Sequence, residues 1–357
     1  MELTVTKNPN PGKLPDSNNL VFGRTFTDHM FLMDYTRAEG WKNARIVPYG
    51  PITLDPAASV FHYGAEVFEG LKAYRKADGS VQLFRPWENM KRMQNSALRM
   101  GLPAVPEDLA LEAVLKLVEL DQDWVPSAPG TSLYVRPFII SVDADLAVHG
   151  VSTALFCVIL SPVGSYFAGG LKPVKMMFET EDVRAVRGGT GYAKCGGNYA
   201  ASNRAANRAA EKGYDQVLWL DGVERKYIEE GGAMNIMFKI DGTVVTPALT
   251  GSILPGITRD SCIRMMQSWG LPVEERLVSV DEVVQAAKEG RLEECWCCGT
   301  AAVISPVGAL GYGDEEYVIH DMQIGEVSQK LYDSLTDIQW GRAEDPFQWT
   351  CPVTFAE

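Results

Sequence analysis

The chain lacks any hydrophobic run long enough to cross a membrane. Its longest uninterrupted apolar stretch, Ala154 to Leu160, is far shorter than the ~18–20 residues of a membrane-spanning helix. The N-terminal segment also lacks the apolar core of a secretory signal and the Arg-rich and Ser-rich pattern of a transit peptide. These absences predict a cytoplasmic protein without a membrane partner.

Positive charge is scarce as well. The chain has 33 Lys and Arg against 46 Asp and Glu, which gives a formal net charge of −13 at pH 7. A protein that binds nucleic acid usually presents a basic face to the phosphates, so no nucleic-acid partner is predicted. The hydrophobic fraction of 46% and the charged fraction of 22% are ordinary for a globular protein. A length of 357 residues then favours two domains, each with a core of its own.

Patterns that would ligate a metal are missing too. The chain has 4 His, none of them paired at helical spacing, and a structural zinc site needs several N or S ligands. The 7 Cys are odd in number and mostly scattered singly, which favours reduced thiols. Cys295, Cys297 and Cys298 form a cluster, but it lies in an apolar, strand-like run without a second pair or a nearby His. No metal site is predicted.

Strands and helices are mixed along the chain without regular alternation. Residues 1–20, rich in Pro and Asn, predict an extended arm. Apolar periodicity predicts helices over residues 86–100, 107–120 and 198–213, and strands over 81–84, 132–142, 153–160, 174–179 and 216–220. Asp241-Gly242 predicts the tight turn of a hairpin. This mixture favours an α+β fold over a doubly wound sheet.

One segment predicts a boundary between two domains. Residues 161–173 are dense in Gly and Pro and show little apolar periodicity, which is typical of a linker. We therefore predict a small N-terminal domain over residues 1–163, a linker over 164–173 and a large domain over 174–357.

A glycine-rich passage, Arg187–Tyr199, carries a single lysine, Lys194. A P-loop is excluded, because Cys195 stands where Ser or Thr would hold magnesium. A dinucleotide fingerprint is excluded, because Lys194 stands where its third glycine is needed. A lysine held in a partly desolvated loop can instead act as an amine nucleophile toward an aldehyde. Taken alone, the passage is equally compatible with a solvated lysine in a surface loop.

Later segments supply the other groups that pyridoxal 5'-phosphate needs: an acid for its ring nitrogen and donors for its phosphate. Glu229 and Glu230 run into a glycine turn between two predicted strands. Residues 251–259 lead into a predicted helix whose first N–H groups can bind a phosphate. The turn 299–302 adds the hydroxyl of Thr300. Together with Lys194 these segments favour a pyridoxal-phosphate site.

Several motifs resemble those of one family, the branched-chain amino acid aminotransferases of the fold-type IV class of pyridoxal-phosphate enzymes. In chain order they are FHYGAEVFEGLKAYR, LFRPWENMKRM, SLYVRP, GGTGYAKCGGNY, YIEEGGAMN and SILPGITR. The matching segments extend from Phe22 to about Pro306. The resemblance implies a two-domain α+β fold with a smaller N-terminal α/β domain, a larger C-terminal domain built on a mixed-sheet pseudo-barrel, and a homodimer.

The resemblance also implies which residues hold the cofactor. Lys194 would bond to the cofactor aldehyde and carry the proton at the substrate Cα. Glu230 would face the pyridine nitrogen, since it keeps the family's spacing to Met234 and Asn235, whereas Glu229 does not. The remaining contacts would be a hydrogen bond to the phenolic oxygen from Tyr199, and phosphate contacts from Arg85, Ile257, Thr258 and Thr300.

The family's substrate pocket is apolar, and its matching positions here are Phe22, Tyr63, Phe68, Tyr134, Arg136 and Ala301. The Ala301 turn would receive the substrate carboxylate. Arg136 would pair with the side-chain carboxylate of glutamate, because an arginine in a hydrophobic strand needs a partner. Gly231 and Ala233 depart from the family pattern, and we expect looser packing on the substrate side of that turn.

The resemblance thus implies a transaminase that exchanges the amino group of L-leucine, L-isoleucine or L-valine with 2-oxoglutarate. Two other enzymes of the same fold remain open: a D-amino acid aminotransferase and an aminodeoxychorismate lyase. A non-catalytic protein that binds phosphate or a nucleotide through the same glycine-rich loop remains open as well, although it would need no reactive Lys194.

Overall fold

The computed structural model describes residues 2–164 and 170–354, and the chain divides into two compact units. The first unit holds the N-terminal half up to residue 164, together with residues 193–196 and 337–354. The second unit holds residues 170–192 and 197–336. Half of the predicted linker, residues 165–169, lies outside the described residues.

Within the described residues, the first unit is built on a sheet of nine strands in the order β1-β3-β2-β8-β7-β5-β6-β18, with β4 paired to β7. Neighbouring strands are antiparallel except β1 and β3, which are parallel. The strands are β1 (Thr4–Val5), β2 (His29–Thr36), β3 (Gly40–Pro48), β4 (Glu66–Phe68), β5 (Leu71–Arg75), β6 (Val81–Phe84), β7 (Ser132–Ser141), β8 (Thr153–Val163) and β18 (Thr350–Val353).

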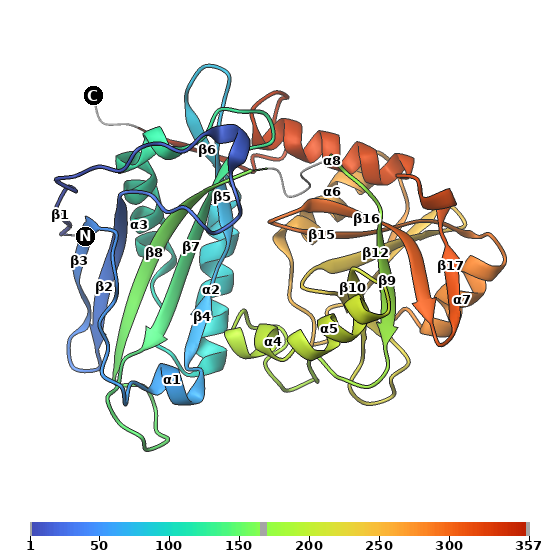
Figure 1. Ribbon diagram of the computed structural model, residues 1–357, viewed down its shortest axis with the longest axis horizontal. Coiled ribbons are helices and arrows are strands. Elements are labelled where there is room, and N and C mark those ends of the chain that lie inside the picture. The colour runs from blue at the N-terminus through green and yellow to red at the C-terminus, as the bar shows by residue number, and fades with distance from the viewer. Residues whose placement is uncertain (1, 165–169, 355–357) are drawn as a thin grey trace. The chain divides into compact units, whose positions relative to one another are not determined.

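Two long helices, α2 (Pro86–Met100) and α3 (Glu107–Leu120), cover one face of this sheet (Figure 1). Both confirm the predicted ranges. Helix α2 begins with a proline, which has a fixed φ suited to the first turn, and ends at Gly101 in the left-handed region. The short helices of this unit are α1 (Ser59–Tyr63), η1 (Ser17–Asn19) and η2 (Gln122–Trp124).

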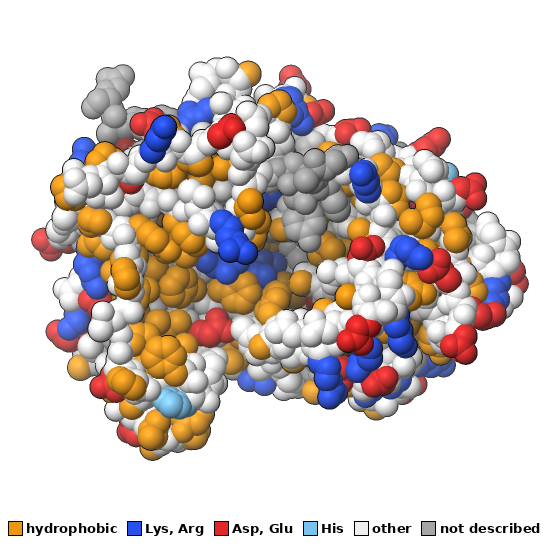
Figure 2. Space-filling model, in the orientation of Figure 1, with side chains coloured by type: hydrophobic (Ala, Val, Ile, Leu, Met, Phe, Trp, Pro, Cys, Tyr) orange, Lys and Arg blue, Asp and Glu red, His pale blue; other side chains and the backbone are white. Residues whose placement is uncertain are grey.

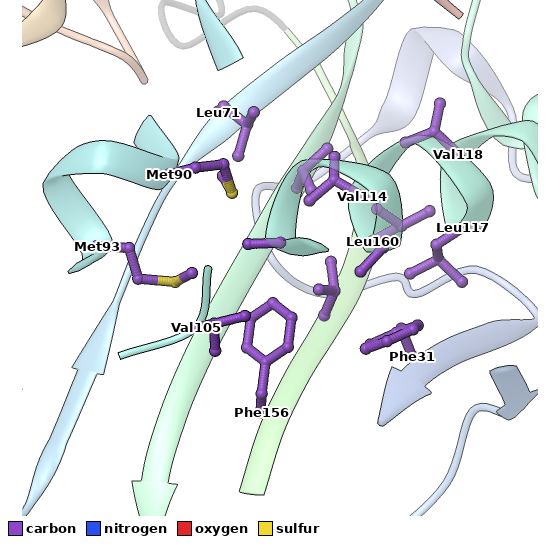
Figure 3. Packing of buried hydrophobic residues seen from close by; sticks show 14 of the residues in the cluster. Phe31, Leu71, Met90, Met93, Val105, Val114, Leu117, Val118, Phe156 and Leu160 are labelled. Carbon is purple, nitrogen blue, oxygen red and sulfur yellow. The ribbon is translucent and has the colours of Figure 1, made fainter. Parts of the chain in front are cut away.

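The methionines of α2 lie in the core. Met90 and Met93 are fully buried, and Val114 and Leu117 of α3 pack into the same cluster with Phe156 of the sheet (Figure 3). Burying one side chain of this size contributes about 1.5–3 kcal/mol. The core of the first unit therefore lies between the sheet and these two helices.

The C-terminal end of the chain does not follow the predicted domain division. Strand β18 pairs with β6, so that Thr350 lies opposite Phe84. The Gln82 side-chain amide also donates to the carbonyls of Ile338 and Gln339, at 2.9 Å each. Residues 337–354 therefore belong with the first unit and enlarge it at the expense of the second. The physical reason is that β6 would otherwise be an edge strand with unpaired backbone groups.

The second unit is built on another sheet of nine described strands, in the order β11-β10-β9-β16-β15-β12-β13-β14, with β17 paired to β16. The sheet is mixed, since β9 runs parallel to β10 and β16, and β13 runs parallel to β14. The strands are β9 (Val174–Glu179), β10 (Gln216–Leu220), β11 (Ile228–Gly231), β12 (Asn235–Ile240), β13 (Thr243–Pro247), β14 (Val273–Arg276), β15 (Leu292–Gly299), β16 (Val303–Tyr312) and β17 (Glu315–Val318).

The hairpin and one helix of this unit test the local predictions. Asp241 and Gly242 both have positive φ between β12 and β13, which confirms the hairpin turn. The helix expected over 198–213 is divided into α4 (Gly196–Ala200) and α5 (Asn203–Glu211), and Ala205 and Ala209 of α5 pack on Trp219. The other helices are α6 (Ile257–Ser268), α7 (Val280–Lys288), η3 (His320–Met322) and α8 (Glu326–Gln339), whose residues from 337 on belong with the first unit.

Two mixed or antiparallel sheets with helices packed against them confirm the α+β class. None of the helices in the described part of the chain is long and apolar enough to cross a membrane.

Candidate active site

Lys194 lies in the short segment that packs with the first unit, and its backbone is held at several points. Its N–H donates to the hydroxyl of Ser96 at 2.9 Å, and its carbonyl accepts from the N–H of Phe68 at 3.0 Å. The Lys194 Nζ lies 4.7 Å from the centroid of the Phe68 ring. The side chain is only partly exposed. This is a positioned amine rather than a solvated lysine in a surface loop.

Glu66, which the sequence-based prediction missed, holds the turn after Lys194. It accepts a hydrogen bond from the N–H of Gly196, where a Cβ would lie only 2.5 Å from the Glu66 carboxylate. Burial raises the pKa of Glu66, although the hydrogen bond from the Gly196 N–H and the charge of Arg136 each act to lower it.

Glu69 is a second glutamate that the prediction missed. It is fully buried, and burial would raise its pKa, but the bidentate Arg92 and the charge of Lys194 lower it. The only sequence signal for Glu66 and Glu69 was their place in the HYGAEVFEG motif.

Four of the predicted substrate residues form one cluster with Lys194. The Arg136 guanidinium lies 4.8 Å from the Phe68 ring centroid and 5.3 Å from that of Tyr134, whose hydroxyl accepts from Arg136 at 3.2 Å. Phe22 packs edge-on against Tyr134, with ring centroids 4.9 Å apart. Phe68 therefore links the amine of Lys194 to the guanidinium of Arg136.

The structure places two other candidates of this unit elsewhere. Tyr63 ends α1 and donates its hydroxyl to the backbone carbonyl of Leu146. Arg85 precedes α2 with a φ of 48°, is 3% exposed and donates its N–H to the Trp349 carbonyl at 2.6 Å. A left-handed arginine directly before a proline is strained, and such strain concentrates at functional positions.

Lys72 is a further residue that the sequence-based prediction missed. It lies opposite Tyr134 in the pairing of β5 with β7, on the same face as Tyr134 and Arg136. It is 7% exposed, and burial lowers its pKa to about 8.

In the second unit, Glu230 on β11 is 3% exposed and paired with a buried cation. Its carboxylate accepts from the N–H of Leu254 at 2.7 Å and lies 3.1 Å from Nη2 of Arg184. Arg184 also donates to the carbonyls of Gly191 and Ser252. It thus ties the glycine-rich passage and the loop before α6 to the acid. Arg184 lies outside every motif used above, so the sequence offered no signal for it.

The other three predicted phosphate contacts, Ile257, Thr258 and Thr300, lie on two neighbouring elements of this unit. Helix α6 begins at Ile257, earlier than expected, so Ile257 and Thr258 form its first turn. The preceding residue, Gly256, has no side chain to cap this end, and such a helix N-terminus is suited to an anion. Strand β15, which packs against α6, leads into the turn with Thr300 and Ala301.

The backbone after that turn is strained. Val303 has a φ of 63°, which is costly for a β-branched residue and marks a turn that the surrounding structure must hold in place. Tyr199 lies in α4 and is partly buried.

Gly231 is closely packed on the side that faces β15 and β9, and the looser packing expected on the substrate side of the turn stays a prediction. A Cβ at this position would lie 2.5 Å from Sγ of Cys297 and 2.9 Å from Cε of Met176. Gly231 is therefore required by close packing on β15 and β9, whereas Ala233 is exposed.

The groups present fit pyridoxal phosphate by their chemistry. The first unit offers a fixed amine, and the second offers a buried carboxylate with its own cation and the N-terminus of α6. An aldehyde, a pyridine nitrogen and a phosphate are the complementary groups.

Comparison with known proteins points to one family. The profile of the family described as "Amino-transferase class IV" matches residues 66–310. The chain is 55% identical, over 353 residues, to "Branched-chain-amino-acid aminotransferase 2" of Bacillus subtilis (strain 168), covering 99% of this chain and 96% of that one.

Solved structures agree as well. The crystal structure of the branched-chain amino acid aminotransferase of Escherichia coli superposes with a TM-score of 0.75 at 26% identity, covering 92% of this chain and 99% of that one. The branched-chain aminotransferase of the archaeon Thermoproteus uzoniensis, solved with norvaline, superposes with a TM-score of 0.75 at 25% identity, covering 91% and 100%. A third branched-chain amino acid aminotransferase, solved with pyridoxamine 5'-phosphate, superposes with a TM-score of 0.75 at 27% identity, covering 90% and 98%.

Arg184→Gln is expected to destabilise the protein strongly, because it leaves the Glu230 carboxylate buried without its cation. The free energy of unfolding should fall by about 3–5 kcal/mol, measured by urea denaturation followed by circular dichroism. Arg204→Gln is the matched control, since its side chain is 77% exposed and its pair with Asp182 lies at the surface. The control should change stability by less than about 1 kcal/mol. Equal losses in the two variants would contradict the assigned role of Arg184.

Lys72 is expected to make stability depend on alkaline pH. Its pKa is 10.5 when exposed and about 8 when folded, so between these values the unfolded chain holds a proton that the folded chain has lost. Stability therefore rises with pH across this window, by about 3 kcal/mol in total. Relative to Lys72→Met, the unaltered chain should therefore gain free energy of unfolding as the pH is raised from 7.5 to 10. Lys91→Met, on the exposed side of α2, is the control and should show no such growth. A difference independent of pH in Lys72→Met would refute the prediction.

Proposed function

The chain belongs to the class IV aminotransferase family, and from this premise we propose a pyridoxal-phosphate-dependent transaminase acting on branched-chain L-amino acids and 2-oxoglutarate. The observation that carries the proposal is the 55% identity to a branched-chain aminotransferase over 99% of the chain. The positioned amine of Lys194 supports it from the structure.

Pyridoxal phosphate, when bound, supplies an aldehyde that exchanges amino groups and a ring that accepts electron density from the substrate Cα. Lys194 would hold the aldehyde through Nζ and would carry the proton at the substrate Cα. Glu230 would hold a proton at the pyridine nitrogen, and Arg184 keeps this carboxylate in place. Tyr199 would donate to the phenolic oxygen. Arg85, Ile257, Thr258 and Thr300 would hold the phosphate.

The cluster around Arg136 suits both classes of substrate. The faces of Phe22, Phe68 and Tyr134 offer apolar contact to an aliphatic side chain. The guanidinium of Arg136 offers a partner to the second carboxylate of glutamate or 2-oxoglutarate. By the family resemblance, Ala301 would receive the substrate carboxylate through its turn, and Tyr63 would add a further substrate contact.

We further propose a homodimer that acts in the cytoplasm. Hydrophobic side chains gather on the face of the first unit over α1 (Figure 2). The exposed members of this region are Phe61, Tyr63, Leu146 and Val148, at 62%, 46%, 61% and 82% exposure. An exposed apolar patch of this kind is typical of an interaction surface.

The substrate class is tested by steady-state assays with 2-oxoglutarate. L-Leucine, L-isoleucine and L-valine should be turned over, whereas D-alanine should not. Lys194→Ala should lose turnover by about 10³-fold or more, because both the bond to the cofactor and the proton transfer are lost. It should keep its melting temperature. Lys212→Ala, at an exposed position after α5, is the control and should keep full activity. Turnover of D-alanine alone, or an active Lys194→Ala, would overturn the proposal.

A further inference from the structure

Two oppositely charged side chains, Glu66 and Arg136, lie on the same face of the first unit's sheet. Glu66 stands opposite Ile140 in the pairing of β4 with β7, and Arg136 lies on β7 itself. Side chains two or four residues apart on a strand point to one face. Phe68 of β4 shares this face, and its ring centroid lies 4.8 Å from the Arg136 guanidinium. Glu66 therefore lies beside the proposed substrate contacts.

Each of the two charged groups keeps an open atom. Among the described residues, the Arg136 guanidinium donates only to the Tyr134 hydroxyl, and the Glu66 carboxylate accepts only from the Gly196 N–H through Oε1. Nη1 of Arg136 and Oε2 of Glu66 have no such partner, yet neither is among the buried polar atoms that lack one. Both atoms are therefore open to solvent and to a ligand.

The two charges act on each other across this face. Burial raises the pKa of Glu66, whereas the charge of Arg136 and the Gly196 hydrogen bond act to lower it. An ionised Glu66 in turn offsets the charge of Arg136, so the two groups together carry no net charge. Such a neutral pair suits the aliphatic side chain of leucine, because no uncompensated charge is left beside apolar atoms.

A second substrate carboxylate disturbs this balance. The proposed function assigns the side-chain carboxylate of glutamate or 2-oxoglutarate to Arg136, so the site would then hold two anions and one cation. When two carboxylates share a site, the pKa of one of them rises, because both are not easily ionised together. A proton on Glu66 restores the neutral balance. The open oxygen, Oε2, can carry this proton while Oε1 continues to accept from Gly196.

We propose that Glu66 takes up a proton when the second carboxylate of glutamate or 2-oxoglutarate binds Arg136, and that it stays ionised when an aliphatic side chain occupies this place. The proton comes from solvent, is held on Oε2 and returns to solvent when the dicarboxylate leaves. Glu66 is thus a specificity-determining residue that lets one site accept both classes of substrate. The inference rests on the proposed function, which assigns Arg136 to that carboxylate.

Other charged groups on the elements around Glu66 have to be separated from it in a test. Lys72 of β5 shares the face, but below pH 7 it already holds its proton, since its pKa is about 8. Arg92 of α2 is bonded to Glu69, whose side chain lies on the other face of the sheet. A change at Lys194 cancels when two ligands with the same first carboxylate are compared.

The test is isothermal titration calorimetry of the full-length holoenzyme between pH 6 and pH 7, in two buffers of different ionisation enthalpy. The ligands are 2-oxoglutarate and 4-methyl-2-oxopentanoate, which share the 2-oxo acid group and differ in the second carboxylate. The holoenzyme in its pyridoxal form has no amino group to transfer to either of them. The difference in heat between the buffers counts the protons taken up. At its maximum, 2-oxoglutarate should bring about 0.3 proton or more per chain beyond 4-methyl-2-oxopentanoate.

Two variants assign the proton to its residue. Glu66→Gln keeps an oxygen for the Gly196 N–H but cannot ionise, so the additional proton uptake with 2-oxoglutarate should be lost. Glu39→Gln is the matched control and should keep it, because Glu39 lies in the turn between β2 and β3 with a side chain that is 59% exposed.

Equal proton uptake with the two oxo acids in the unaltered chain overturns the proposal, and this comparison decides the matter even if Glu66→Gln fails to fold. Additional uptake that persists in Glu66→Gln overturns it as well. Absence of saturable 2-oxoglutarate binding would contradict the proposed function too, whereas binding without additional uptake contradicts only the role of Glu66.

Discussion

The buried pair of Arg184 and Glu230 is the interaction on which the second unit's site depends. A carboxylate that is 3% exposed is stable only beside a cation and hydrogen-bond donors, and Arg184 and the Leu254 N–H supply both. Because Arg184 also binds the carbonyls of Gly191 and Ser252, the same guanidinium fixes the glycine-rich passage and the loop before α6. The acid, the passage and the start of the helix are therefore positioned together.

The first unit fixes the amine by different means. Residues 193–196 belong with this unit although the chain on both sides of them belongs with the second. Hydrogen bonds with Ser96, Phe68 and Glu66 hold the turn, and the ring of Phe68 lies beside Nζ. The amine therefore has a defined place before any ligand binds, which reduces the ordering cost of binding. Arg136 lies on the same ring, so the proposed substrate contact is tied to the position of the amine.

Local structure with a strong local cause could be predicted from the sequence. Helices α2 and α3 and the Asp241-Gly242 hairpin follow from periodicity, end residues and turn chemistry. The C-terminal strand could not be predicted, because its reason is the open edge of β6, far away in the sequence. The division of the 198–213 helix could not be predicted either, because the break between Ala200 and Asn203 contains no Gly or Pro.

The candidate site, too, could be predicted from the sequence only in part. Lys194 and Glu230 were identified by motif, but Arg184, Glu66 and Lys72 matter through burial, which no motif carries. The close packing at Gly231 could not be predicted either, because the side chains beside it, Cys297 and Met176, lie far away in the sequence.

The central claim is that Lys194 is the amine that binds the cofactor. Reduction of the holoenzyme with borohydride, followed by peptide mapping, tests it most directly. The account predicts a pyridoxyl group on the peptide that contains Lys194, and a pyridoxyl group on Lys72 or any other lysine would contradict it.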